Sequence, residues 1–434
     1  KYFIVTISNF SISLIIPSKD DLKQLIAVLK GINVQDLLPQ EIIIVDTSIK
    51  DEISDYIKNY KSIVPINYYR EANAYPGKAR NIGVRKAKEK WIAFLDSKTI
   101  PKKNWLKKNV NKIISNDLDV VFGFTKYIPE TFKQKIIRAA TFGAIGHETT
   151  PGTLLQKKYF LNNFEFNEKA RAGEDLEWRN RIKACNLFKI NKKNEITLLY
   201  YSLPNTIFSV IYKYLIYSFH SAYLDIQRNI KEVYLTIFLI LTAIIIPQWN
   251  LLLEGFHNHP LYVPNITKIY ISSLVFIVLL SSLWRIVFIK KIFSSFFITS
   301  LKFTLFILLC FTIINWEKTY GKWVSFNIWQ IPHITKLFIF SILLFSLISR
   351  GLILPINRKI HFTFLFPLNW LFIGFIGLLI DVVKAPGYIL GAVLFPLYHL
   401  KIIDFKTKTY NFLKENDYSI KKILILCPYP INTA

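Results

Sequence analysis

The stretch WIAFLDSKTIPKKNWL, residues Trp91–Leu106, decides the fold of the first half of this chain. It opens with the apolar run Trp91–Leu95, which ends at Asp96 and is followed by polar residues, and such a run predicts a buried strand. In open α/β sheets, ligands bind beyond the carboxyl ends of the strands. Asp96 therefore stands where a ligand is expected, although a carboxylate that only caps a turn would show the same pattern.

Strands and helices alternate along the chain around this stretch. We predict further strands at residues 11–17, 41–45, 66–69 and 119–124, and helices at 22–29, 79–90 and 173–184. This alternation predicts an α/β fold with a mostly parallel sheet flanked by helices. Because the carboxyl ends of parallel strands meet at one edge, Pro17 and Ser18 after the first strand and Asp46 after the second should lie near Asp96.

Composition separates the chain into two parts. Hydrophobic residues make up 52% of its 434 residues and the mean hydropathy is +0.30, which is too apolar for one soluble domain. The apolar residues gather after about residue 232, whereas residues 1 to about 200 have the composition of a soluble α/β protein. The three cysteines, Cys185, Cys310 and Cys427, are far apart and indicate neither a disulfide framework nor a zinc site.

The formal net charge of +26 predicts attraction to anionic partners. In a chain with apolar spans, these are membrane lipids with anionic headgroups and phosphate-bearing substrates. No basic helix, aromatic repeat or zinc spacing accompanies the charge, so no nucleic acid is expected as a partner.

We divide the chain into four segments. Residues 1–203 form the α/β domain, and 204–231, which mix aromatic residues with Lys213, His220 and Arg228, are helices at a membrane interface or a plain linker helix. Residues 232–400 hold five or six transmembrane helices. The spans are Val233–Trp249, Ile269–Ile289, Ile292–Ile314, Leu337–Leu354 and Phe362–Val383, with Tyr388–Leu400 as a shorter segment. Residues 401–434 are a cytoplasmic tail, in which 421–430 are either the truncated start of a further domain or an edge strand of the first.

The positions of lysine and arginine predict the orientation of a multi-pass protein in a bacterial-type inner membrane. The cations of the connections, Lys290, Lys291, Arg350, Arg358 and Lys359, fall between alternate spans. By the positive-inside rule these connections and the basic α/β domain face the cytoplasm. Asp381 and Lys384, at the end of an apolar run, either pair within the membrane or reach the interface, and we favour the interface.

Four segments of the first half, taken in order, resemble family-two glycosyltransferases with the GT-A fold. They are ISLIIPSKDD, EIIIVDTS, GKARNIGVRKAKEKWIAFLDSKTIPKKNWL and AGEDLEWRNRI, and the resemblance covers about residues 11–200. It implies transfer of a sugar from a nucleotide-sugar donor. In that family the residue matching Asp46 contacts the nucleotide base. The residue matching Asp96 begins an Asp-x-Asp motif near the ribose and diphosphate, and the one matching Asp175 is the general base.

The chemistry of sugar transfer also requires a carboxylate such as that of Asp175. Transfer with inversion needs a base that removes the proton of the acceptor hydroxyl as the bond to the donor phosphate breaks. Glu174 and Asp175 open a predicted helix, where acidic residues are also favoured by the helix dipole, so a capping role is the alternative. Which of the two residues acts as the base stays open.

Other polar residues are expected around the donor and the acceptor. In PGKARN, Gly77 allows close backbone approach, and Lys78 and Arg80 can donate to the diphosphate. Four residues are predicted on the acceptor and phosphate side: Gly152, Thr153, Arg179 and Arg181. A simple turn is the alternative at Gly152 and Thr153, and His147 is a less favoured candidate for a second base.

The chain departs from the family at Lys98, which replaces the second carboxylate of the metal-binding motif. A protonated lysine cannot bind Mg²⁺ or Mn²⁺. Either Lys98, Arg80 and an arginine such as Arg179 or Arg181 neutralise the leaving diphosphate, or a metal remains on Asp96, or catalysis is lost. We favour the first reading.

The prediction is therefore a membrane-bound inverting glycosyltransferase of glycan biosynthesis at the cell envelope. No Gln-x-x-Arg-Trp motif of processive synthases follows Asp175, which favours transfer of one sugar to a lipid-linked or glycan acceptor. The alternatives are a catalytically idle binding or scaffold protein on a membrane anchor, and a transporter or channel. Few ionisable residues interrupt the apolar spans, which argues against transport.

Overall fold

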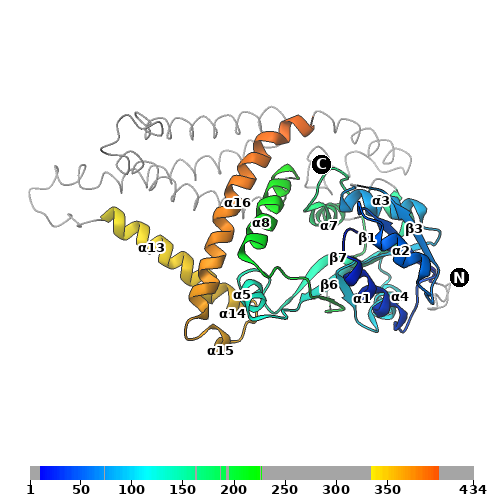
Figure 1. Ribbon diagram of the computed structural model, residues 1–434, viewed down its shortest axis with the longest axis horizontal. Helices are drawn as coiled ribbons and strands as arrows, with labels where there is room; N and C mark the ends of the chain where they lie inside the picture. The colour runs from blue at the N-terminus through cyan, green and yellow to red at the C-terminus, as the bar shows by residue number, and fades with distance from the viewer. Residues whose placement is uncertain are drawn as a thin grey trace, which may run out of the picture.

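The computed structural model describes residues 10–226, except 73, 162–163, 186, 192–194 and 225, together with residues 334–399. The three predicted spans between residues 233 and 314 and the tail 401–434 lie outside these ranges. Figure 1 shows an α/β unit around a sheet, with the long helices α8, α13 and α16 to one side of it.

The sheet has eight strands in the order β3-β2-β1-β4-β7-β6-β8-β5. β1 pairs in parallel with β2 and β4, and β2 with β3, so this half matches the predicted parallel sheet. β7 then runs antiparallel to both β4 and β6. The bounds are β1 Ile12–Ser18, β2 Glu41–Asp46, β3 Ile66–Arg70, β4 Trp91–Phe94, β5 Thr99–Pro101, β6 Val120–Tyr127, β7 Gly146–Gln156 and β8 Leu198–Tyr200.

Helices cover both faces of this sheet. Successive strand residues point to opposite faces, so Leu14 packs with α1 and α4 on one side, and Ile15 packs with α3 and α7 on the other. The two apolar cores meet only through the sheet, as the alternation of buried residues predicts. The helices are α1 Leu22–Asn33, α2 Glu52–Asn59, α3 Pro76–Lys86, α4 Trp105–Asn116, α5 Phe132–Thr141, α6 Lys157–Leu161 and α7 Glu174–Ala184.

The segment with Pro151 and Gly152, where a turn was the alternative reading, is the middle of strand β7. A shift of register in the β6–β7 pairing lies opposite it, between Val121 and Gly123. Gly152 has φ +89°, and a Cβ there would lie 2.5 Å from the Leu198 side chain. Pairing with two neighbouring strands has overridden the local turn signals.

Gly152→Ala is expected to lower the free energy of unfolding by about 1–3 kcal/mol. The backbone conformation at this position is strained for alanine, and the Leu198 side chain already fills the space that the new methyl group would need. Chemical unfolding of the full chain followed by tryptophan fluorescence measures this change. Gly31→Ala in α1, whose added Cβ would lie 3.3 Å from Pro101, is the control and should change stability little. Equal effects of the two substitutions would contradict the strained role of Gly152.

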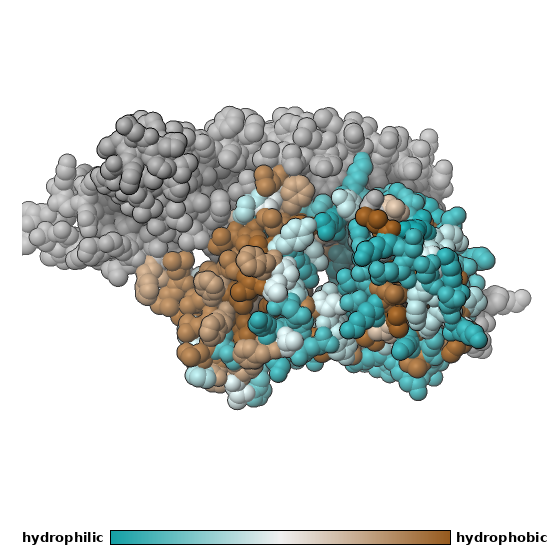
Figure 2. Space-filling model, in the orientation of Figure 1, coloured by the Kyte–Doolittle hydropathy of each residue, from teal (hydrophilic) through white to brown (hydrophobic). Residues whose placement is uncertain are grey.

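The C-terminal part that the structure describes is helical. α16 (Asn369–His399) packs lengthwise against α8 (Ile207–Tyr223) and also contacts α5. α13 (Ile334–Ile348) continues through a π-helical turn, Ser349–Ile353, into α14 (Leu354–Asn357), and α15 spans Phe362–Leu365. In Figure 2 the apolar surface gathers on these helices, whereas the α/β unit is mostly hydrophilic.

Within the described residues, one helix is long and apolar enough to cross a membrane, Asn369–Tyr388. The predicted span Phe362–Val383 is corrected at its start, because Pro367 separates α15 from α16 and proline cannot continue a helix from the preceding turn. The predicted span Leu337–Leu354 falls on α13 and the π-helical turn, and the apolar helix there, Leu343–Asn357, is shorter than a span.

Asp381 and Lys384 are paired in the structure, and their position relative to a membrane stays a prediction. Asp381 is 8% exposed, and its carboxylate lies 2.5 Å from the Arg350 guanidinium and 3.4 Å from Lys384 Nζ. Arg350 comes from the π-helical turn, which the sequence did not place beside α16. Buried charges persist where they are paired, so this group joins the π-helical turn to α16.

Candidate active site

The carboxyl ends of β1, β2 and β4 form one edge of the sheet. Ser18 is in register with Asp46, and the Leu95 amide donates to the Ile15 carbonyl, which places Asp96 just beyond the next strand. Pro17 lies within β1, opposite Val45. The strand order therefore carries these residues to the edge that the parallel pattern predicts.

Arg80 on α3 joins two carboxylates that are distant in sequence. Its Nη1 donates to Glu174 at 2.8 Å and its Nη2 to Asp96 at 2.7 Å, and its side chain is 4% exposed. The guanidinium also lies over the Phe166 ring, 5.3 Å from the centroid. Arg80 was expected to donate to a diphosphate, but in this arrangement its two terminal nitrogens donate to the carboxylates of Asp96 and Glu174.

Glu174 and Asp175 differ in their surroundings, although both lie in the first turn of α7. Burial raises the pKa of Glu174 to about 7, and the positive charge of Arg80 opposes this rise. The side chain of Glu174 is 6% exposed and that of Asp175 is 33% exposed. An acceptor from solvent can therefore reach Asp175, while Glu174 is enclosed and tied to Arg80.

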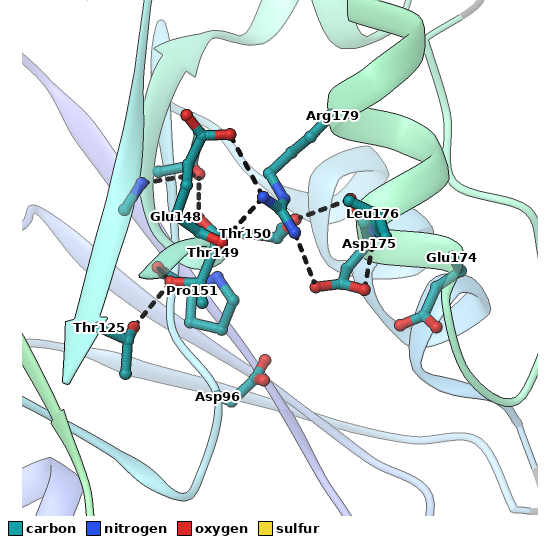
Figure 3. A network of polar contacts seen from close by, with 12 residues as sticks. Asp96, Thr125, Glu148, Thr149, Thr150, Pro151, Glu174, Asp175, Leu176 and Arg179 are labelled. Carbon is teal, nitrogen blue, oxygen red and sulfur yellow. Dashed lines mark hydrogen bonds and ion pairs between the residues drawn. The ribbon is translucent and has the colours of Figure 1, made fainter. Parts of the chain in front are cut away.

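Arg179, one turn along α7, orients Asp175. Its Nη2 lies 3.6 Å from Asp175 Oδ2, and its Nη1 donates to the Glu148 carbonyl at 2.8 Å. Figure 3 shows Arg179 between Glu148 on β7 and Asp175, with Asp96 and Glu174 nearby. The other carboxylate oxygen of Asp175 accepts from the Leu176 amide at 2.7 Å. Asp175 is thus held in place while part of it stays open to solvent.

Asp46 is fully buried at the end of β2. Ser48 donates to one oxygen from its amide and its hydroxyl, at 2.9 and 2.6 Å, and the Tyr68 hydroxyl donates to the other at 2.7 Å. Burial and this bond to Asp46 raise the pKa of Tyr68 to about 12. A carboxylate has about four acceptor positions, so little capacity remains, and the contact of Asp46 with a nucleotide base stays a prediction.

Asp21, the last residue of the segment ISLIIPSKDD, ties two strand ends together. Its Oδ1 accepts from Ser18 Oγ at 2.6 Å, and its Oδ2 accepts from Ser97 Oγ. Burial raises the pKa of Asp21, against the effect of these hydrogen bonds. Asp21 precedes α1 without capping it by its side chain. The spacing Ser18-x-x-Asp21 is the local signal, but its partner Ser97 is visible only in the fold.

Three further residues that were predicted to contact the diphosphate or the acceptor are Lys78, Lys98 and Arg181. Lys78 Nζ pairs with Glu71 at 2.6 Å, and Arg181 on α7 binds Glu177 at 2.8 Å. Lys98 is half-buried in the turn after β4 and has no ion pair with a described residue. Arg181 also donates to the backbone carbonyl of Glu165, which precedes α7, and neither of these two contacts is with Asp175.

Two residues expected on the acceptor side have a packing role instead. Thr153 is fully buried, and its hydroxyl accepts from the Gly123 amide. The Gly152 carbonyl accepts from the side chains of Trp105 and Asn109, at 3.1 and 2.8 Å. Both lie inside the β6–β7 pairing, where an acceptor would not meet them.

His147 Nε2 lies 2.7 Å from the Phe142 carbonyl, and burial lowers its pKa.

The residues at Asp96 do not fit a divalent cation. In the ranges that the structure describes, no group of three or more His, Cys, Asp or Glu side chains could hold a metal ion. Asp96 is already paired with Arg80, and Lys98 lies two residues further on. In phosphate sites Mg²⁺ is held by one or two carboxylates together with substrate phosphates, and here the single carboxylate is already paired with Arg80.

Comparisons with known proteins agree with the motifs. Residues 13–173 match the family described as Glycosyl transferase family 2. An uncharacterized glycosyltransferase of Rickettsia conorii is 29% identical over 204 residues, which are 44% of this chain and 32% of that protein. Chondroitin synthase of Escherichia coli is 28% identical over 185 residues, 40% of this chain and 26% of that protein.

A solved structure, S. aureus TarS 1-349 in complex with UDP-GlcNAc, aligns with 48% of this chain and 64% of its own, at 17% identity and a TM-score of 0.35. The chain spans about a third of the length of the Rickettsia relative. The family match begins in β1 and ends at Gly173, so it contains Asp46, Arg80 and Asp96 and stops just before Glu174. Residues 13–173 of this chain therefore carry the sequence pattern of glycosyltransferase family 2, on a mixed sheet flanked by helices.

Proposed function

We propose that the chain is a membrane-bound inverting glycosyltransferase. It transfers one sugar from a nucleotide-sugar donor to a lipid-linked or glycan acceptor at the cytoplasmic face of the membrane. The observation that carries the proposal is the position of Asp175, a partly exposed carboxylate beside the buried Arg80–Glu174 pair and the partly exposed Asp96, at the ligand-binding edge of a family-two domain.

In this mechanism Asp175 accepts the proton of the acceptor hydroxyl. The hydroxyl oxygen forms a bond to the anomeric carbon while the bond from that carbon to the diphosphate oxygen breaks, and the electron pair leaves with the nucleoside diphosphate. Attack from the side opposite the leaving group inverts the anomeric configuration. Arg179 holds Asp175 in position, and Lys98 neutralises charge on the diphosphate.

The membrane part of the proposal rests on the apolar helices. α16 contains a segment of spanning length, and α8 packs along it and continues from the α/β unit. An acceptor held in the bilayer would reach the edge of the sheet beside α8. Multi-pass topology and the cytoplasmic orientation come from the charge pattern of the sequence and stay predictions.

A screen of nucleotide sugars tests the function. Membranes that contain the full chain are incubated with radiolabelled donors of each base, lipids are extracted, and labelled glycolipid is measured, with Asp175→Asn membranes as the control. Transfer from one donor that Asp175→Asn abolishes is the expected result. If no donor is either transferred or hydrolysed, the alternative of a catalytically idle membrane-anchored binding protein, which Lys98 motivates, takes its place.

We expect turnover to persist in EDTA, because Lys98 and the Arg80–Asp96 pair occupy the place of a metal site. Initial rates of the purified full chain with EDTA, Mg²⁺ and Mn²⁺ measure this. Lys98→Asp is the informative variant: it restores a second carboxylate and should make turnover depend on an added divalent ion. Full loss of wild-type activity in EDTA, recovered by Mg²⁺ or Mn²⁺, would contradict the expectation.

A further inference from the structure

Helix α8 and the residues after it contact the segments that lead into α7 and α3, which carry charged residues of the site. Near the start of α7, Leu224 and Ile226 after α8 form an apolar cluster with Ala170, and Arg171 Nη1 lies 3.5 Å from the Tyr212 hydroxyl. At the start of α3, the Tyr75 ring lies 6.3 Å from His220. α8 therefore lies beside the beginnings of the two helices that carry Arg80 and Glu174.

Lys213 of α8 lies among aromatic rings that continue to the sheet. Its Nζ is 5.4 Å from the centroid of the Tyr217 ring and 5.8 Å from that of Phe142. Phe142 stacks on Tyr127 of β6 at 3.7 Å, and Tyr127 lies 5.2 Å from Tyr200 of β8. The rings provide a partial attraction for the ammonium group but no negative charge.

Lys213 also feels the charge of the catalytic edge. Burial and, to a smaller extent, the positive charge of Lys98 together lower the pKa of Lys213 to about 8. Lys98 lies in the turn after β4, and the next residue, Thr99, pairs with Tyr200 of β8, so the row of rings that begins at Lys213 ends beside that turn. Two like charges in a partly buried place destabilise each other unless an anion lies between or beside them.

No described carboxylate forms an ion pair with either lysine, because Asp21, which interacts electrostatically with Lys98, uses its two oxygens to accept hydrogen bonds from Ser18 and Ser97. Arg80 pairs with Asp96 and Glu174, and Arg179 pairs with Glu148 and Asp175, whereas neither Lys98 nor Lys213 has an ion pair with a described residue. The arginines of the site are paired with carboxylates of the protein, whereas the two lysines are available to bind an anionic ligand. Lysine is a compact point charge that suits phosphate.

We propose that Lys213 is a substrate-binding residue that, together with Lys98, binds a phosphate group. This inference rests on the proposed function and adds a residue to it. Lys213, from the helix that packs on α16, helps to neutralise the phosphate charge that a metal ion at Asp96 would otherwise neutralise. The phosphate comes either from the diphosphate of the donor or from a lipid phosphate of the acceptor.

The test uses the full chain in lipid nanodiscs with Lys213→Gln, Lys213→Leu and Lys213→Arg. Inorganic pyrophosphate is the probe for the donor side, and a polyprenyl monophosphate in the nanodisc is the probe for the acceptor side. Each is measured as an inhibitor of donor hydrolysis and by its effect on thermal unfolding. Lys58→Gln, which removes an exposed lysine paired with Asp55 on α2, is the matched control.

Lys213→Gln is expected to weaken one of the two probes by about tenfold or more, as for loss of a hydrogen bond to a charged group. Lys213→Arg should keep most of the binding, and Lys58→Gln should keep all of it. Weaker pyrophosphate binding assigns the donor diphosphate, and weaker polyprenyl phosphate binding assigns the acceptor. Lys213→Leu, which keeps the contacts with the rings, replaces Lys213→Gln if the latter unfolds.

A double-mutant cycle with Lys98→Gln tests whether both lysines hold the same group, since residues that share a partner give non-additive losses. Additive losses would overturn the shared site. Unchanged binding of both probes in Lys213→Gln and Lys213→Leu, with a wild-type chain that transfers sugar, would overturn the inference alone. A wild-type chain that neither transfers nor hydrolyses any donor would instead overturn the proposed function.

Discussion

Asp175→Asn is expected to lower kcat by about 10²- to 10⁴-fold, the usual loss when a general base is removed. The amide keeps the size of the carboxylate and can still accept from the Leu176 amide, so the fold should persist. KM for the donor should change little, because Asp175 acts on the acceptor proton. Initial rates at saturating donor and acceptor, with thermal unfolding as a check of folding, measure the effect.

Glu174→Gln is the matched comparison, because it makes the same chemical change at the adjacent residue. Glu174 is enclosed and bound to Arg80, so its loss should destabilise the site and reduce kcat less than the change at Asp175 does. A chain in which Glu174→Gln is inactive while Asp175→Asn keeps most of its turnover would reverse the assignment of the base.

Arg80→Met should reduce the free energy of unfolding by about 3–5 kcal/mol, the loss expected when one partner of a buried ion pair is removed. The methionine fills much of the space but leaves Glu174 buried without a cation, and its pKa should rise further above its ordinary range. Unfolding by denaturant, followed by the fluorescence of the buried Trp105 and Trp178, measures the change.

Arg85→Met on the same helix is the control. Arg85 is 46% exposed and pairs with Glu165 and Glu168 at the surface, where an ion pair contributes about 1 kcal/mol or less. A loss of stability in Arg80→Met no larger than in Arg85→Met would contradict the bridging role of Arg80. Raising the pH should not rescue Arg80→Met, because ionised Glu174 is the form that lacks its partner.

Much of the catalytic edge could be predicted from local patterns. The apolar run before Asp96 is the strand β4, and the run before Asp46 is β2, since strand residues buried on both faces have few other places in a soluble domain. The helix that begins at Glu174 was also predicted to within a residue. These elements depend on short-range periodicity and on polar residues that end each run.

The tertiary structure decided which of these side chains meet. Arg80 and Glu174 are 94 residues apart, and no local pattern indicates that one guanidinium holds both Glu174 and Asp96. Strand β7 was hidden by Pro151 and Gly152, because its pairing with β4 and β6 stabilises a backbone that the local sequence disfavours.

By itself, then, the sequence determined the α/β class, the order of the carboxylates along the chain and the family. Only the fold decided that Glu174 is enclosed while Asp175 is open, that Gly152 and Thr153 are core residues, and that Lys213 of α8 lies over the ring of Phe142. The physical reason is that burial and charge pairing depend on distances between residues far apart in the chain, and these distances exist only after the helices pack on the sheet.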